Sequence, residues 1–191
     1  MTTDQLTETR RGIIAATMVG ALAGLPTATD AAERAPTGHI DDFDFLIGAW
    51  RVRHHQLVGR LVGSTTWRDF DGTCVAQKIL GGQGNLDDNV LHIPSGTYQG
   101  ASLRLFDPEK KIWSIFWIDS RSSKVEPPVA GGFDGAHGVF FGDDQWDGRP
   151  VRVRFQWSVE SADRARWEQA FSGDVGLTWE TNWVMHFERT A

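Results

Sequence analysis

Apolar and polar side chains alternate along the stretch Trp179-Glu180-Thr181-Asn182-Trp183-Val184-Met185-His186-Phe187-Glu188, with the apolar residues at odd positions. The stretch Val151-Arg152-Val153-Arg154-Phe155-Gln156-Trp157 follows the same rule. Successive side chains of a β-strand point to opposite faces of the sheet, so this pattern predicts strands with one buried face and one polar face. Both segments therefore predict an antiparallel, all-β fold.

Eight further strands are expected between turn signals formed by Gly, Asp, Asn and Pro. They begin at Trp50, Ser64, Cys74, Asn89, Gly100, Ile112, Gly138 and Ala165. Residues 120–132, with Pro127-Pro128 and Gly131-Gly132, are expected to form a long rim loop. About ten strands in a single domain indicate a closed antiparallel β-barrel or a sandwich.

Composition excludes several classes of protein. The chain has 191 residues, 25 acidic against 19 basic, and a net charge of -6, which leaves no extended basic surface for nucleic acid. A single cysteine, Cys74, cannot form an internal disulfide or a multi-thiolate zinc site, and no metal is predicted. The 9 Trp and 11 Phe, beside 1 Tyr, are the unusual feature of the composition.

Residues 1–35 have the pattern of a targeting signal. Arg10-Arg11 precede a moderately apolar run that stops at Pro26, which resembles a twin-arginine export signal. The run is too short and weak for a transmembrane helix, so no integral membrane segment is expected in the mature domain, residues 36–191. The protein is then exported to the periplasm or outside the cell. The alternative is a disordered or helical tail on a cytoplasmic protein.

One turn has a specific pattern. Residues 172–179, Ser172-Gly173-Asp174-Val175-Gly176-Leu177-Thr178-Trp179, match the Asp-box sequence found at hairpin turns of sialidases and other β-proteins. The Asp174 carboxylate can accept backbone N–H groups, and Gly supplies permissive dihedral angles. A single copy predicts a hairpin and not a glycosidase.

The segment Gly48-Ala49-Trp50 opens the first predicted strand and resembles the G-x-W signature of lipocalins and related calycins. That resemblance implies a barrel with a short N-terminal helix closing one end, Trp50 over the closed end, and an Arg from the last strand across its ring. Arg189 has the position and parity for this role, and such a cation–π contact is worth about 0.5–2 kcal/mol. The segments 167–171 and 179–183 are similar to those of a group of uncharacterised bacterial single-domain lipocalin-like proteins. The resemblance covers about residues 43–189 and implies no reaction.

Nitrobindins are haem-binding relatives of this architecture, which makes haem a minor alternative; otherwise no cofactor is predicted. Nitrobindins carry more glycines after the G-x-W, where this chain has Arg51-Val52-Arg53, and a proximal His near the C-terminus. His186 lies in the last predicted strand, but its parity places it on the outer face, whereas axial ligation needs an imidazole that points into the pocket.

If Trp50 and Arg189 face the interior, parity predicts which side chains line it. The expected lining is Val52, His54, Trp113, Ile115, Trp117, Asp119, Val153, Phe155, Trp157, Ala165, Trp167, Gln169, Phe171, Thr181, Trp183, Met185 and Phe187. We take Trp117, Trp157, Trp167, Gln169, Trp183 and Met185 as the ligand-binding set. A cavity walled by indoles suits a small hydrophobic or aromatic ligand. The alternative is a barrel that these side chains simply fill.

Two polar residues of this set are candidates for catalysis. His54 and Asp119 could form a proton-transfer dyad for cofactor-independent isomerase, lyase or cyclase chemistry. The competing interpretation of Asp119 is a local ion pair with Arg121. Gln169 could donate to a ligand carbonyl or satisfy a neighbouring backbone group. Glu168, Glu180 and Asn182 have the opposite parity and are expected on the outer face, where they are solvated, paired with arginines or in contact with a subunit. A homo-oligomer is left open.

Overall fold

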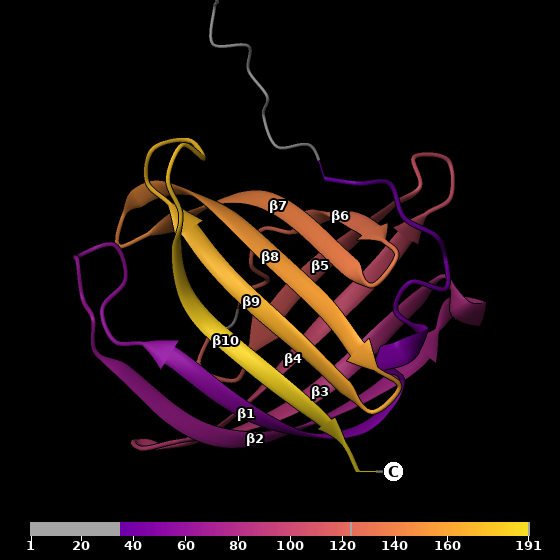
Figure 1. Ribbon diagram of the computed structural model, residues 1–191, viewed down its shortest axis with the longest axis horizontal. Coiled ribbons are helices and arrows are strands. Elements are labelled where there is room, and N and C mark those ends of the chain that lie inside the picture. Colours follow the sequence, from indigo (N-terminus) through magenta and orange to yellow (C-terminus); the bar gives the residue numbers. More distant parts are fainter. Residues whose placement is uncertain (1–34, 123, 191) are drawn as a thin grey trace, which may run out of the picture. The chain divides into compact units, whose positions relative to one another are not determined.

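The structure is a computed structural model that describes residues 35–122 and 124–190. Ten strands run through them: β1 (Gly48–Leu57), β2 (Trp67–Ile79), β3 (Gly84–Ile93), β4 (Gly96–Asp107), β5 (Ile112–Asp119), β6 (Val129–Asp134), β7 (His137–Trp146), β8 (Arg149–Ser161), β9 (Arg164–Ser172) and β10 (Glu180–Arg189). Each strand pairs antiparallel with the next, and β1 also pairs with β10, so the sheet closes into a barrel (Figure 1). The prediction of an all-β, ten-stranded antiparallel barrel is confirmed. The predicted export signal lies outside the described residues.

Burial alternates along the strands as the sequence pattern predicts. In β8, Val151, Val153 and Trp157 are buried, whereas Arg152 and Arg154 on the other face are only half-buried. The interior of the barrel is therefore built from one face of each strand, and that face carries most of the aromatic side chains.

The predicted number of strands, ten, is confirmed, but two of the predicted strands are wrong. The strands predicted from Ser64 and Cys74 are one continuous strand, β2, which passes through Gly72 without a turn. A Cβ at Gly72 would lie 2.6 Å from the carbonyl oxygen of Val90 and 2.8 Å from Nε2 of His54. This glycine therefore serves a close approach inside the sheet, not a turn.

The missing tenth strand lies in the segment predicted as a rim loop. Residues 129–134 form β6, which pairs with β5 and β7. The glycines that suggested a loop allow another segment to pack closely: a Cβ at Gly132 would lie 2.5 Å from the backbone nitrogen of Gly38. The loop is therefore shorter than predicted and covers residues 120–128.

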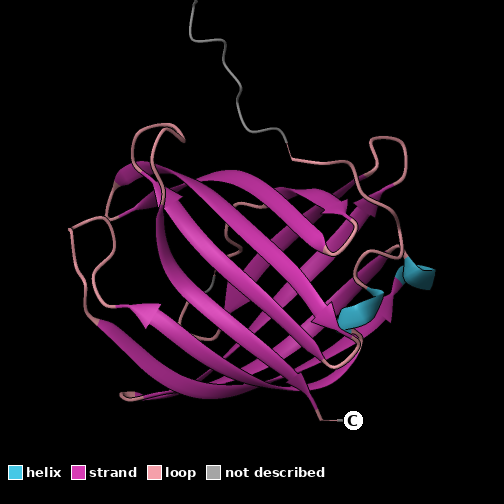
Figure 2. Cartoon of the chain, in the orientation of Figure 1, coloured by secondary structure: helices cyan, strands magenta, loops and turns pink. Residues whose placement is uncertain are grey.

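One end of the barrel is closed by the segment that precedes β1. The 3₁₀ helix η1 (Asp44–Leu46) lies at this end together with η2 (Leu80–Gly82), as Figure 2 shows. Phe43 and Leu46 are fully buried, and the indole Nε1 of Trp50 donates to the carbonyl oxygen of Leu46 at 2.7 Å. These residues cover the aromatic core at this end of the barrel.

The contact expected between Trp50 and Arg189 is present. The guanidinium carbon of Arg189 lies 4.2 Å from the centre of the Trp50 ring. The same guanidinium donates to the carbonyl oxygens of Phe45 (2.5 Å) and Ile47 (2.8 Å). Arg189 thus joins the last strand to the segment that closes the barrel.

A β-bulge interrupts the alternation of β10. The register with β9 shifts between Thr181 and Trp183, so Asn182 is an extra residue. Asn182 is completely buried, and its prediction on the outer face is wrong. For the same reason Thr181, which pairs with Ala170, does not line the cavity as predicted.

The Asp-box segment forms the turn that its sequence predicts. The Asp174 carboxylate accepts the backbone N–H of Thr178 at 2.9 Å and its hydroxyl at 2.6 Å. The Ser172 hydroxyl donates to Asp174 and accepts the backbone N–H of Gly176, whose φ is 94°. Hydrogen bonds from Ser172 and Thr178 lower the pKa of Asp174 to about 2.

Candidate functional site

A cavity of about 660 Å³ occupies the barrel and extends to the loops 58–66 and 120–128, at the end away from η1. We call this end the mouth. The volume lies in the range of about 300–1,000 Å³ that is typical of small-molecule sites. The predicted lining residues that border it are His54, Ile115, Trp117, Asp119, Val153, Phe155, Trp157, Trp167, Gln169, Phe171, Trp183, Met185 and Phe187. All six residues of the predicted ligand-binding set are therefore at the cavity.

Three other predicted lining residues face the interior between the cavity and the closed end of the barrel. Val52, Trp113 and Ala165 are buried in the core at the closed end. Trp113 packs edge-on against Phe43, with ring centres 5.1 Å apart, and its Nε1 donates to the carbonyl oxygen of His39. Parity identified the correct face here, but it carries no information about depth along the barrel axis.

One wall of the cavity is aromatic. On β8, β9 and β10 the rings of Phe155, Trp167 and Trp183 follow one another edge to face. Ring centres are 4.8 Å apart for Phe155 and Trp167, and 5.8 Å apart for Trp167 and Trp183. Rings in such contacts hold one another in place, so this wall offers a rigid apolar surface.

The facing strands β3 and β4 supply a polar wall, which the sequence analysis did not predict. Arg104 and Asp87 form an ion pair, with 2.6 Å between Nη2 and Oδ2 and side chains only 4% and 3% exposed. Arg104 also donates to Asn85 at 2.9 Å, and Asp87 accepts from Asn89 and from the backbone N–H of Ser102. The signal was present in the sequence: Arg104 lies between Leu103 and Leu105, and has the parity of the buried Tyr98.

Two buried donors next to this wall have no hydrogen-bond partner among the described residues. They are Nε of Arg104 and Nε1 of Trp157. The guanidinium carbon of Arg104 lies 6.0 Å from the centre of a Trp157 ring, and both residues border the cavity. A buried donor without a partner costs about 1–3 kcal/mol, so an acceptor at this position would be bound favourably.

His54 is buried on β1 and makes its contacts with aromatic residues. Its ring stacks on Phe70, with 4.5 Å between ring centres, and its Nδ1 accepts a hydrogen bond from Nε1 of Trp183 at 3.2 Å. Burial lowers the pKa of His54 to about 3. The imidazole is therefore neutral at physiological pH and a weak base for proton transfer.

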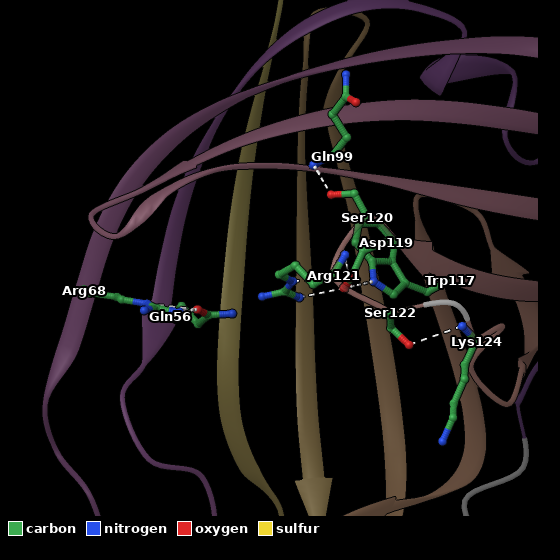
Figure 3. A network of polar contacts seen from close by, with 9 residues as sticks. All are labelled: Gln56, Arg68, Gln99, Trp117, Asp119, Ser120, Arg121, Ser122 and Lys124. Atoms are coloured by element: carbon green, nitrogen blue, oxygen red, sulfur yellow. Dashed lines mark hydrogen bonds and ion pairs between the residues drawn. The ribbon is translucent and has the colours of Figure 1, made fainter.

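Asp119 ends β5 at the mouth and forms the local ion pair that the sequence analysis weighed against a catalytic role. Its carboxylate accepts from Nη2 of Arg121 at 2.6 Å and from Nε1 of Trp117 at 3.4 Å (Figure 3). The hydrogen bond from Arg121 lowers the pKa of Asp119. His54 and Asp119 thus border the same cavity but bind different partners, and their role as a dyad stays a prediction.

Gln169 has a partner within the barrel wall. Its Nε2 donates to Oδ1 of Asn182, the bulged residue of β10, at 2.8 Å. Of the residues predicted on the outer face, Glu168 contacts Arg166, and Glu180 accepts the backbone N–H of Leu61 at 2.7 Å. The second of these contacts fastens the loop 58–66 to the start of β10.

The histidine that the sequence analysis weighed as a haem ligand does not face the cavity. His186 is exposed on the outer face of β10, as its parity predicts. No group of three or more His, Cys, Asp or Glu side chains suited to a metal ion occurs in residues 35–122 and 124–190. Within the same residues, no helix is long and apolar enough to cross a membrane.

No model of a protein family matches the chain, and no curated protein matches it. Among solved structures it is similar to a redesigned β-barrel, with a TM-score of 0.45 and 9% sequence identity. The match covers 81% of this chain and 99% of that one.

Proposed function

We propose that the protein binds a small hydrophobic or aromatic molecule inside the barrel. The observation that carries this proposal is the two-sided lining of the 660 Å³ cavity. Phe155, Trp167 and Trp183 form an apolar wall, and the buried pair of Asp87 and Arg104 belongs to the facing strands. An aromatic ring can stack on the first wall while a polar substituent of the same molecule faces the second.

The two donors without a partner indicate which polar group the ligand should carry. Nε of Arg104 and Nε1 of Trp157 are both N–H donors, so the molecule should carry an acceptor, such as a carbonyl or ether oxygen, at its inner end. A lipocalin-like role is part of this proposal. The cation–π contact between Arg189 and Trp50 supports it, because the resemblance implies an Arg of the last strand across that ring.

The test is a titration with N-phenyl-1-naphthylamine, a neutral aromatic dye whose fluorescence rises in an apolar site. We expect saturable binding to the full chain and quenching of tryptophan emission by energy transfer to the dye. The Ser102→Leu variant places a larger side chain in the cavity and should weaken binding about tenfold, because overpacking a site costs about 1–3 kcal/mol.

The matched control is Ala101→Leu, which adds a leucine at the neighbouring position of β4, where the side chain does not border the cavity. It should leave the affinity for the dye unchanged. If the wild-type chain does not bind the dye, or if both variants weaken binding equally, the barrel is a packed structural module and the proposal fails.

A further inference from the structure

Arg60, in the loop 58–66, carries a guanidinium at the mouth of the cavity that forms no ion pair with a carboxylate of the described residues. Its guanidinium carbon lies 4.7 Å from the ring centre of Trp146, 5.3 Å from that of Phe171 and 5.9 Å from that of Trp183. Among the described residues its side chain has neither a hydrogen bond nor an ion pair. The three rings attract the cation and hold it beside the cavity, but they leave its five N–H donors free.

Arg68, on β2, is the second guanidinium of this kind. Its hydrogen bonds go to Oε1 of Gln56, a neutral amide, at 3.0 Å from Nε and also from Nη2 (Figure 3). In the described part of the chain, no carboxylate lies within ion-pair distance of Arg68. Arg60 and Arg68 border the same cavity, and the positive charge of Arg68 is one of the smaller causes of the lowered pKa of Arg60.

The chain does supply an acidic partner to other arginines of the cavity. Arg121 is paired with Asp119, and Arg104 with Asp87. Glu126 also borders the mouth, and burial raises its pKa. Its carboxylate attracts Arg60 from a distance but does not form an ion pair with it. Two like charges kept together without a carboxylate in direct contact cost free energy, which an anionic ligand would recover.

The environment of Arg60 would strengthen such an interaction. Burial lowers the pKa of Arg60 to about 10, so the group stays protonated at neutral pH but is poorly hydrated. A guanidinium that has already lost water binds a carboxylate, sulfonate or phosphate through charge-assisted hydrogen bonds, and its planar fork fits these groups.

We propose that Arg60 and Arg68 bind the anionic end of an aromatic acid, while its apolar part lies against Trp167 and Trp183. This inference rests on the proposed function and adds the charge of the ligand and the direction in which it enters. The acid group would remain at the mouth, and the acceptor expected near Arg104 would be at the opposite end of the molecule.

Two dyes with the same ring system test this inference separately from the proposed function. 8-Anilinonaphthalene-1-sulfonate carries a sulfonate, whereas N-phenyl-1-naphthylamine carries no charge. We expect Arg60→Met and Arg68→Met each to weaken binding of the sulfonate about tenfold, which corresponds to about 1.4 kcal/mol. Binding of the neutral dye should change less than about twofold, which also shows that each variant is folded.

The matched control is Arg164→Met, at the other end of the barrel and exposed, which should not affect either dye. Raising the salt concentration should weaken binding of the sulfonate alone. Two outcomes refute the anion site and leave the proposed function standing, provided that the neutral dye binds. In the first, both arginine variants bind the sulfonate like the wild type. In the second, they weaken binding of both dyes equally. If the neutral dye does not bind at all, both proposals fall.

Discussion

Replacing Arg104 by methionine should destabilise the barrel strongly, because the substitution leaves the carboxylate of Asp87 buried without its partner. The two side chains are 4% and 3% exposed, and their contact is 2.6 Å long. Removing one member of such a pair costs about 3–5 kcal/mol. In a domain of this size each kcal/mol lowers the melting temperature by about 2–4 °C, so the expected decrease is about 10 °C.

The double variant Asp87→Asn with Arg104→Met separates the lost ion pair from lost packing. It removes both charges, while an amide oxygen at position 87 can still accept from the backbone N–H of Ser102. The double variant should therefore recover at least half of the loss. The control is Arg53→Met: Arg53 is 64% exposed, its pair with Glu188 lies in water, and the change should stay within about 1 kcal/mol.

The assay is urea unfolding followed by tryptophan emission, with the denaturant slope compared between variants to confirm that the same surface is exposed on unfolding. The reasoning is refuted if Arg104→Met costs less than about 1 kcal/mol, since the pair would then be solvated through the cavity. It is also refuted if the double variant is no more stable than the single one.

Other contacts lead to three further predictions. Arg189→Met should cost about 3 kcal/mol in urea unfolding and Arg189→Lys less, because only the guanidinium can bond three carbonyl oxygens and stack on an indole; equal losses would contradict this. For His54, the pKa of about 3 in the folded state lies below the ordinary value of 6.5. Between these two values only the unfolded chain binds a proton at this residue, so the stability of the fold decreases as the pH falls through 6.5. Between pH 6.5 and 5 the wild type should lose about 2 kcal/mol more than His54→Gln, and parallel pH profiles would rule this out. Asp174→Ala should speed hydrogen exchange at the backbone amide of Thr178 without affecting the barrel strands, and unchanged exchange would argue against the bonded turn.

The sequence by itself determined the fold class, the parity of most strands and the local contacts. Alternation with a period of two is a property of each strand alone, so Val153 and Trp167 could be placed on the inner face without a structure. The pair of Asp119 and Arg121 and the turn around Asp174 involve residues only a few positions apart. Such contacts follow from local geometry.

Only the tertiary structure decided what depends on neighbours distant in sequence. The sequence predicts separate strands from Ser64 and Cys74, yet β2 runs on through Gly72, where His54 and the backbone of Val90 approach from adjacent strands. The bulge at Asn182 shifts the parity of β10, and no pattern within that strand announces it.

The cavity itself is a product of barrel closure. Trp167 on β9 and Arg104 on β4 belong to facing walls only because ten strands close into a ring. Whether an inward side chain lines the cavity or packs beneath it depends on depth along the barrel axis, which period-two alternation does not encode. Arg60 reaches the rings of Trp146 and Trp183 through a loop, and loop conformations are set by what they pack against.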